Sequence, residues 1–134
     1  MPAVANRVAA GALVAAISFS SAGGVGLGPL TNNGITNSER KGFYLTLMNP
    51  YPVQERFHLY AVEMDSELPD ARVRIPINRP LLGPKTQRRI LVISTGLAPG
   101  ETYSFRVCAH RVESPGQELI HARVCSKLTA RRTS

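Results

Sequence analysis

The residues best suited to chemistry lie close together near the C-terminal end of this 134-residue chain. The segment VCAHRVESPGQELIHARVC, residues 107–125, holds both cysteines, Cys108 and Cys125, and two of the three histidines, His110 and His121. Two thiols and two imidazoles could form a disulfide, bind zinc or act as a redox pair. The choice depends on the compartment and on the face that each side chain occupies.

Alternation of apolar and polar residues predicts two strands around this segment. In TYSFRVCAHR (residues 102–111) and LIHARVCSKL (119–128) the two kinds alternate, and period two is the signature of strands. Folding the hairpin about residues 116–117 places Cys108 directly opposite Cys125, with both apolar faces on one side. Opposed residues in a non-hydrogen-bonded pair lie about 4.5 Å apart at Cα, within reach of a disulfide.

A zinc site is the competing interpretation, because Cys108, His110, His121 and Cys125 share one face. His121 lies four residues from Cys125, about 13 Å along a strand, so four such ligands cannot all reach one zinc ion at about 2.0–2.3 Å. A redox pair is disfavoured because the sequence has no Cys-x-x-Cys. The pattern favours a Cys108–Cys125 disulfide over a metal site or free thiols, and it predicts neither metal nor cofactor.

The N-terminus predicts export. Arg7 precedes an uncharged run, residues 8–19, and small residues follow, so residues 1–22 are interpreted as a signal peptide cleaved after Ala22. About a dozen apolar residues are too few to span a bilayer of roughly 30 Å as a helix. The alternative is a buried or membrane-anchoring N-terminal helix. We expect a periplasmic or extracellular protein without an integral membrane span, in an oxidising compartment where thiols pair.

The rest of the chain repeats the strand pattern. Seven short strands with turns about every ten residues predict an all-β fold, a single immunoglobulin-like antiparallel β-sandwich over residues 23–130. A basic C-terminal tail, 131–134, is expected to follow. The segment TNNGITNSERKG, residues 31–42, is interpreted as a polar connection. Pro76 places the strand over 72–77 at a sheet edge.

Basic residues concentrate in the C-terminal half. Residues 23–71 carry three Lys or Arg against six acids, whereas residues 72–134 carry twelve against three. In the predicted hairpin Arg106 faces Lys127, and like charges directly opposed reduce stability. The excess forms either a solvated face or a surface for an anionic partner. Export and the lack of a recognised motif argue against nucleic acid. No nucleophile elbow, metal spacing or phosphate loop occurs, so no catalytic residue is predicted.

Several segments resemble known families. FYLTLMNPYPVQERFHLYAVEMD, residues 43–65, and PLLGPKTQRRILVIST, 80–95, resemble the immunoglobulin-like periplasmic pilus chaperone (PapD-like) superfamily, in which a strand ending in Leu-x-Asn-Pro precedes a polar turn. The final strand, with Lys127, is similar to the last strand of that family's N-terminal domain. GLAPGETYSFRVCA, 96–109, resembles the E–F corner of fibronectin type III domains, which implies that the Tyr103 hydroxyl bonds back to the preceding loop.

The chaperone resemblance implies a function, but this sequence departs from the pattern on which that function depends. Those chaperones have two domains, and an Arg on the first strand joins a Lys on the last to bind a subunit carboxylate. Residues 24–30 contain no Arg, so only Lys127 carries over. The sequence predicts a non-enzymatic exported binding or assembly module of the cell envelope, related to pili or fimbriae. Its expected partner is an exported protein such as a fibre subunit, or an acidic surface polymer. The alternative is a structural subunit of a surface filament or virion.

The last strand is the predicted partner-binding edge, which would accept a partner by β-strand addition. The competing arrangement has residues 25–30 covering this edge. Apolar residues would form a bed beneath the partner and basic residues would supply the electrostatic part. The predicted partner-binding residues are Arg106, Ile120, Ala122, Arg123, Val124 and Lys127.

Overall fold

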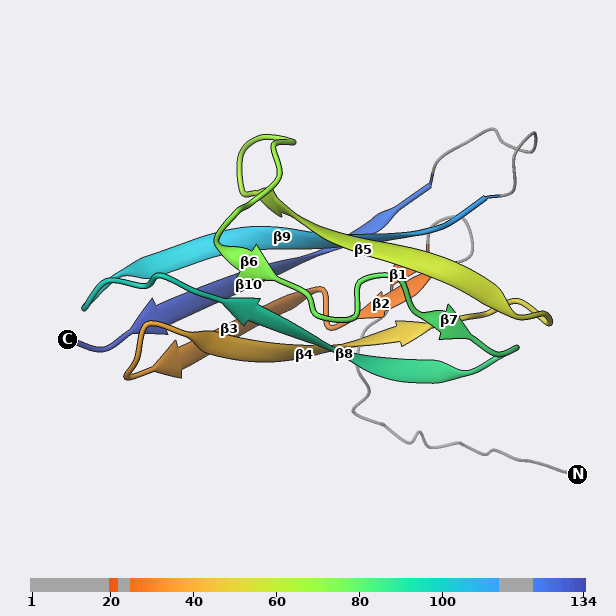
Figure 1. Ribbon diagram of the computed structural model, residues 1–134, viewed down its shortest axis with the longest axis horizontal. Coiled ribbons are helices and arrows are strands. Elements are labelled where there is room, and N and C mark those ends of the chain that lie inside the picture. The colour runs from red at the N-terminus through yellow and green to blue at the C-terminus, as the bar shows by residue number, and fades with distance from the viewer. Residues whose placement is uncertain (1–19, 22–24, 114–121) are drawn as a thin grey trace, which may run out of the picture.

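The structure is a two-layer β-sandwich (Figure 1), in a computed structural model that describes residues 20–21, 25–113 and 122–134. The first sheet has the strand order β1-β2-β4-β8-β6, and the second sheet has the order β3-β10-β9-β5-β7. The strands are β1 (Ser20–Ser21), β2 (Gly26–Gly28), β3 (Thr31–Thr36), β4 (Lys41–Met48), β5 (Glu55–Glu63), β6 (Val73–Arg74), β7 (Leu81–Leu82), β8 (Gln87–Ser94), β9 (Thr102–Arg111) and β10 (Val124–Arg132). The described residues contain no helix, and the expected all-β immunoglobulin-like sandwich is confirmed.

Apolar side chains at alternate positions fill the space between the sheets. Leu45 and Leu47 on β4 are fully buried, as are Phe105 and Val107 on β9. Phe43 packs edge-on against Phe105, with ring centroids 6.2 Å apart. Burying each large apolar side chain stabilises the fold by about 1.5–3 kcal/mol, so the alternation seen in the sequence fixes which face of each strand turns inward.

A buried polar residue closes one end of the core. Asn49, which follows β4, has no exposed surface. Its amide nitrogen Nδ2 donates to the carbonyls of Val53 (2.9 Å), Leu82 (3.2 Å) and Gly83 (2.9 Å). Its Oδ1 accepts from the N–H of Tyr51 at 2.9 Å. One side chain thus joins the end of β4 to the turn after it and to β7, which explains the Asn in the Leu-x-Asn-Pro pattern.

The expected seven strands are too few. The structure adds β1 and β7, which are two residues each, and β3, which lies within the segment interpreted as a polar connection. β3 pairs in parallel with β10, from Lys127↔Thr31 to Arg132↔Thr36. Backbone hydrogen bonds to β10 hold β3 in place, so its side chains need not alternate between apolar and polar. The sequence therefore showed no strand pattern there. β6 lies at the edge of the first sheet, as the nearby proline predicts.

The predicted hairpin register is confirmed. β9 and β10 pair antiparallel with Cys108 opposite Cys125, and the two form a disulfide with Cα atoms 4.0 Å apart. Cys108 is fully buried although it lies on the outer face of its sheet, where Tyr60 and Cys125 flank it. The predicted bounds of the last strand differ, since β10 continues through Arg132 into the expected tail.

Several expectations lie outside the described residues. They include the hairpin turn at 116–117, the positions of Ile120 and His121, and the cleavage after Ala22. Of the predicted signal peptide only Ser20–Ser21 is described, as a short strand paired with β2.

The chain crosses from the first sheet to the second between β2 and β3. β2 pairs with β4, whereas β3 pairs with β10. The crossing itself is tied to β10, because the Ser126 hydroxyl donates to the Pro29 carbonyl at 2.6 Å and the Lys127 N–H donates to the Leu30 carbonyl at 2.8 Å. One short segment therefore links the two layers at the strand that the sequence singled out for partner binding.

Candidate functional site

β10 has a strand neighbour on both sides along most of its length. The prediction of an open edge is wrong for its last six residues, because β3 pairs with them from Lys127 onward. Earlier in β10, residues 124–126 have β9 as their only strand partner among the described residues. The Lys127 N–H points to Leu30, away from β9, and backbone groups alternate in direction along a strand. The N–H and C=O of Cys125, two residues before Lys127, therefore also point away from β9. The pairing with β3 on that side begins only at Lys127.

The predicted partner-binding residues occupy three different environments. Val124, at 5% exposure, faces Ala109 and belongs to the core of this sandwich, so it is not free to form a bed for a partner. Ala122 and Arg123 are half-buried, and Lys127 is exposed on the outer face. Arg106, Arg123 and Lys127 lie together on the outer face of the second sheet. The Val124 side chain points to the opposite face, into the core.

Arg106 and Arg123 both bind one carboxylate, that of Glu67 in the loop between β5 and β6. Arg123 contacts it with two nitrogens, Nη1 to Oε1 at 2.7 Å and Nη2 to Oε2 at 3.0 Å. Arg106 Nη2 reaches Oε2 at 3.1 Å and also donates to the carbonyls of Ser66 and Glu63 at 2.6 and 3.2 Å. The loop thus crosses the outer face of the second sheet and is held there by two arginines.

This pairing changes the electrostatics of the predicted basic face. The hydrogen bonds from Arg123, and then those from Arg106, lower the pKa of Glu67 to about 2, so its carboxylate is charged at neutral pH. The same carboxylate raises the pKa of Arg123. Glu67 therefore offsets the repulsion expected where Arg106 faces Lys127, and Lys127 remains the exposed cation of this group. The sequence did not indicate this pairing, because Glu67 is 39 residues from Arg106.

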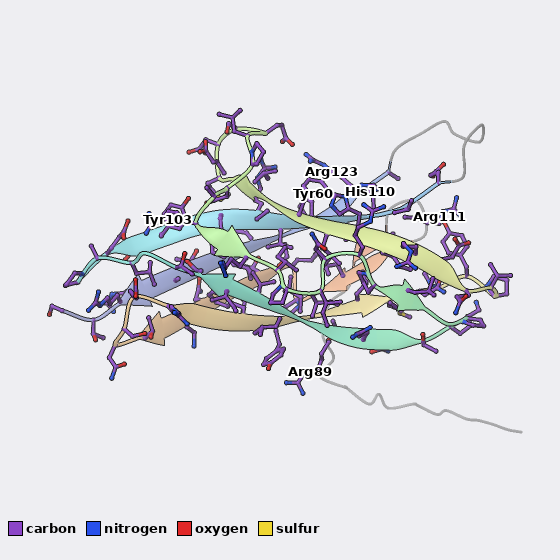
Figure 2. The ribbon with its side chains drawn as sticks, viewed as in Figure 1. Tyr60, Arg89, Tyr103, His110, Arg111 and Arg123 are labelled. Carbon is purple, nitrogen blue, oxygen red and sulfur yellow. A yellow bond between two sulfur atoms is a disulfide. The ribbon has the colours of Figure 1, made fainter. Side chains whose placement is uncertain are left out.

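An aromatic cluster lies beside the disulfide on the same face. The rings of His58 and Tyr60 on β5 and of His110 on β9 have centroids 5.4 to 5.8 Å apart. Arg123 donates to the Tyr60 hydroxyl at 3.2 Å, and Figure 2 labels Tyr60, His110 and Arg123 close together. Burial lowers the pKa of His58, and the neighbouring His110 and Arg79 lower it further. Burial and the neighbouring groups therefore both favour the neutral form of the His58 imidazole.

The Tyr103 hydroxyl is bonded, but to a partner other than the expected one. It donates to Asp70 Oδ2, in the connection between β5 and β6, rather than to the loop over 96–101. Arg72 stacks on the Tyr103 ring, with Cζ 3.9 Å from the centroid, and pairs with Glu101 at 2.8 Å. Burial, followed by the bond to Asp70, raises the pKa of Tyr103 to about 12. These contacts join the connection between β5 and β6 to the connection between β8 and β9.

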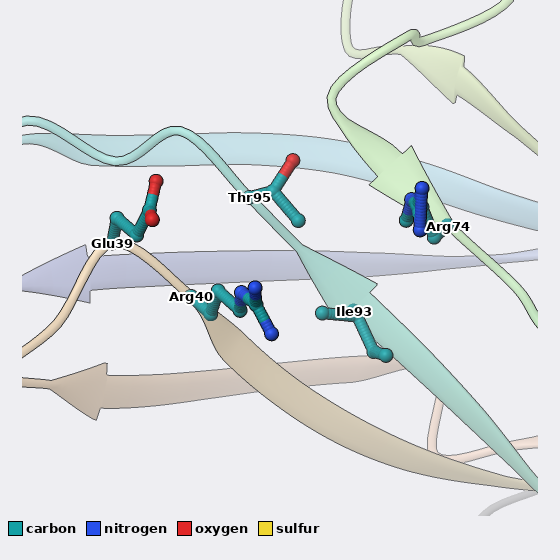
Figure 3. Close-up of a pocket in the computed structure, with 5 residues that line it drawn as sticks. All are labelled: Glu39, Arg40, Arg74, Ile93 and Thr95. Atoms are coloured by element: carbon teal, nitrogen blue, oxygen red, sulfur yellow. The ribbon is translucent and has the colours of Figure 1, made fainter.

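A small open hollow lies at the end of the first sheet. Its volume is about 300 Å³, and Glu39, Arg40, Arg74, Ile93 and Thr95 line it (Figure 3). The Thr95 hydroxyl already donates to the Arg72 carbonyl at 2.8 Å, so it is held by the protein. Arg40 and Arg74 bring guanidinium groups to the hollow and Glu39 brings a carboxylate, so its lining carries charges of both signs.

The described residues contain no group of three or more His, Cys, Asp or Glu side chains arranged to hold a metal ion. Among the same residues, no helix is long and apolar enough to cross a membrane.

Comparison with known proteins finds relatives by structure but not by sequence. No family model matches the chain, and no curated protein matches it. The Escherichia coli chaperone DraB matches with a TM-score of 0.65 at 19% identity, over 85% of this chain and 55% of DraB. A chain in the complex of the Salmonella enterica SafA pilin with the SafB chaperone matches with a TM-score of 0.65 at 21% identity, over 88% of this chain and 57% of that one. The PapD-like domain of human CEP192 matches with a TM-score of 0.57 at 14% identity, over 96% of this chain and 99% of the domain.

These matches establish the fold. The chain has the PapD-like immunoglobulin fold that its sequence resembles, at identities too low to carry a function with it. It spans a little over half the length of the two bacterial chains. The same fold occurs in a human protein, so the architecture by itself does not select an envelope function.

Proposed function

We propose that this protein is a non-enzymatic assembly module of the cell envelope that binds an exported protein partner, such as a pilus subunit. Several of its structural neighbours are chaperones, of which one is described as periplasmic and another is described in complex with a pilin. The disulfide fits an oxidising compartment such as the periplasm. An acidic surface polymer as partner has no comparable support.

The observation that carries the proposal is the partial coverage of β10. Residues 124–126 pair with β9 on one side, and the pairing with β3 begins only at Lys127. A partner strand could add to the backbone groups of Cys125 and continue toward Ala122, since extended segments add readily to exposed sheet edges. Lys127, exposed where this stretch ends, would meet a carboxylate on the partner.

We infer a smaller site than the sequence predicted. Val124 serves the core, and Arg106 and Arg123 are occupied by Glu67, so neither the apolar bed nor the arginines would carry affinity. We expect main-chain hydrogen bonds to supply most of the binding, with Lys127 as the charged contact.

Site-specific photo-crosslinking in the intact envelope tests this proposal. A photoreactive residue replacing Ala122 should capture one or a few exported proteins, identified by mass spectrometry. The same residue replacing Thr46, on the first sheet, is the matched control. Lys127→Glu should weaken capture at position 122, whereas Lys85→Glu, with the same charge change at another exposed lysine, should not. Equal capture at both positions, or capture of non-exported proteins alone, would refute the proposed function.

A further inference from the structure

One sheet edge differs from the other three. The first sheet ends in β1 and β6, and the second ends in β7 and β3. Among the described residues β1, β6 and β7 are two residues long, whereas β3 is six. Proteins usually protect sheet edges by keeping them short or by placing charged residues, proline or a bulge there. β3, with the sequence TNNGIT, has neither charge nor proline.

Only half of the backbone hydrogen-bonding groups of β3 point toward its partner strand β10. The carbonyls of Leu30 and Thr36 accept hydrogen bonds from the N–H groups of Lys127 and Thr133, on the β10 side. Even-numbered residues therefore direct their backbone groups toward β10, and the odd-numbered ones direct theirs away from it. No strand in the described part of the chain pairs with that outer side of β3. Thr31, Asn33 and Ile35 thus present three N–H and three C=O groups along one line.

The side chains of these three residues are exposed as well. They lie on the outer face of the second sheet, because β10 residues paired with Asn32 and Gly34 on the other face, Leu128 and Ala130, are fully buried. Ile35 is 61% exposed, a large value for an isoleucine on a strand. An exposed apolar residue beside unpaired backbone marks a surface suited to strand pairing.

A second copy of this chain can reach this edge without charge repulsion at the contact itself. Two copies with formal net charge +7 each repel one another over most of their surfaces. β3 is a place where they can meet without opposing like charges, because its own residues are neutral and the nearest cations on this face, Lys127 and Arg131, lie one strand back. The sequence is also compatible with twofold pairing. Centred on Asn33, an antiparallel pair places Asn33 opposite Asn33 and each Ile35 opposite a Thr31.

We propose that two copies of this chain associate through β3, antiparallel and around a twofold axis at Asn33, so that their second sheets become continuous. The three outward-facing residues of each copy then exchange backbone hydrogen bonds with those of the other, which is the isologous arrangement of common dimers. This edge is on the opposite side of β3 from β10, so the inference does not depend on the proposed function.

Sedimentation velocity over a concentration series tests the association with purified protein. Wild type should show a concentration-dependent dimer. Ile35→Lys should raise the dimer's dissociation constant by at least about tenfold, equivalent to ~1.4 kcal/mol. Leu68→Lys is the matched control, because Leu68 has the same 61% exposure and the change in charge is identical. A wild type that stays monomeric, or an equal effect of both substitutions, overturns the proposal.

Cysteine cross-linking tests the register independently. Opposed residues in a hydrogen-bonded antiparallel pair are about 5.5 Å apart at Cα, within disulfide range, so Asn33→Cys should form a covalent dimer on mild oxidation. Ile35→Cys should not, since the two introduced thiols would be attached to positions about 13 Å apart along the strands. Efficient cross-linking of both variants, or of neither, contradicts the twofold axis at Asn33.

Discussion

Replacing Asn49 should be among the most damaging single changes in this protein. Asn49→Ala removes the hydrogen bonds that Asn49 makes to four groups, the carbonyls of Val53, Leu82 and Gly83 and the N–H of Tyr51. Of these, the Gly83 carbonyl still accepts from the Thr86 hydroxyl at 2.8 Å. An unsatisfied buried polar group costs about 1–3 kcal/mol. If two of these four groups stay out of reach of water, the free energy of unfolding should fall by about 4 kcal/mol. That is a large part of the roughly 5–15 kcal/mol that stabilises an ordinary domain.

Urea denaturation with the disulfide intact would measure this loss. Asn78→Ala, at an exposed position, is the control and should stay within about 0.5 kcal/mol of wild type. Asn49→Asp has nearly the same shape but places a carboxylate against three carbonyls, so it should be strongly destabilised at neutral pH and partly recover when protonated. If Asn49→Ala also stays within about 0.5 kcal/mol, the argument from buried hydrogen bonds is wrong.

Three further outcomes follow from the described contacts. Cys125→Ser removes a cross-link between residues 17 apart and should cost about 3 kcal/mol by chain entropy, read from the urea midpoint against oxidised wild type. Hydrogen bonds from Arg72 lower the pKa of Glu101 from 4.5 to about 2, so its contribution is present above pH 4.5 and is lost as the pH falls toward 2. Glu101→Gln should flatten this part of the stability curve, and an unchanged slope would count against the pair. Burial lowers the pKa of His58 below 6.5, so the unfolded chain binds the proton more tightly and stability should fall as the pH drops below 6.5. His58→Gln should reduce that fall, as thermal melts at several pH values would show.

The sequence predicted features that depend on alternation within strands. The opposition of Cys108 and Cys125 followed from matching two apolar faces across a hairpin, because a slip of one residue would have turned one face outward. The inward positions of Phe105 and Val107 followed for the same reason. The PapD-like fold was accessible through the order of such segments along the chain.

Features that depend on backbone pairing or on distant loops were not predictable in this way. β3 carries no apolar alternation, so TNNGIT resembled a connection although it covers most of β10. The pairing of Arg106 and Arg123 with Glu67 requires the path of the loop after β5, which no local pattern specifies. Tyr103 was expected to bond, but its partner Asp70 lies 33 residues away.

The parallel pairing of β3 with β10 also determines how the molecule would resist a pull along its chain. Tension applied before β3 and after β10 draws the two strands in opposite directions along their length. The hydrogen bonds between Thr31–Thr36 and the last six residues of β10 are then loaded in shear and must yield together, whereas an antiparallel hairpin pulled at its ends opens one bond at a time. Forced unfolding is governed by the rate of this first rupture. We therefore expect β3, which contributes no fully buried residue to the core, to resist most of such a pull.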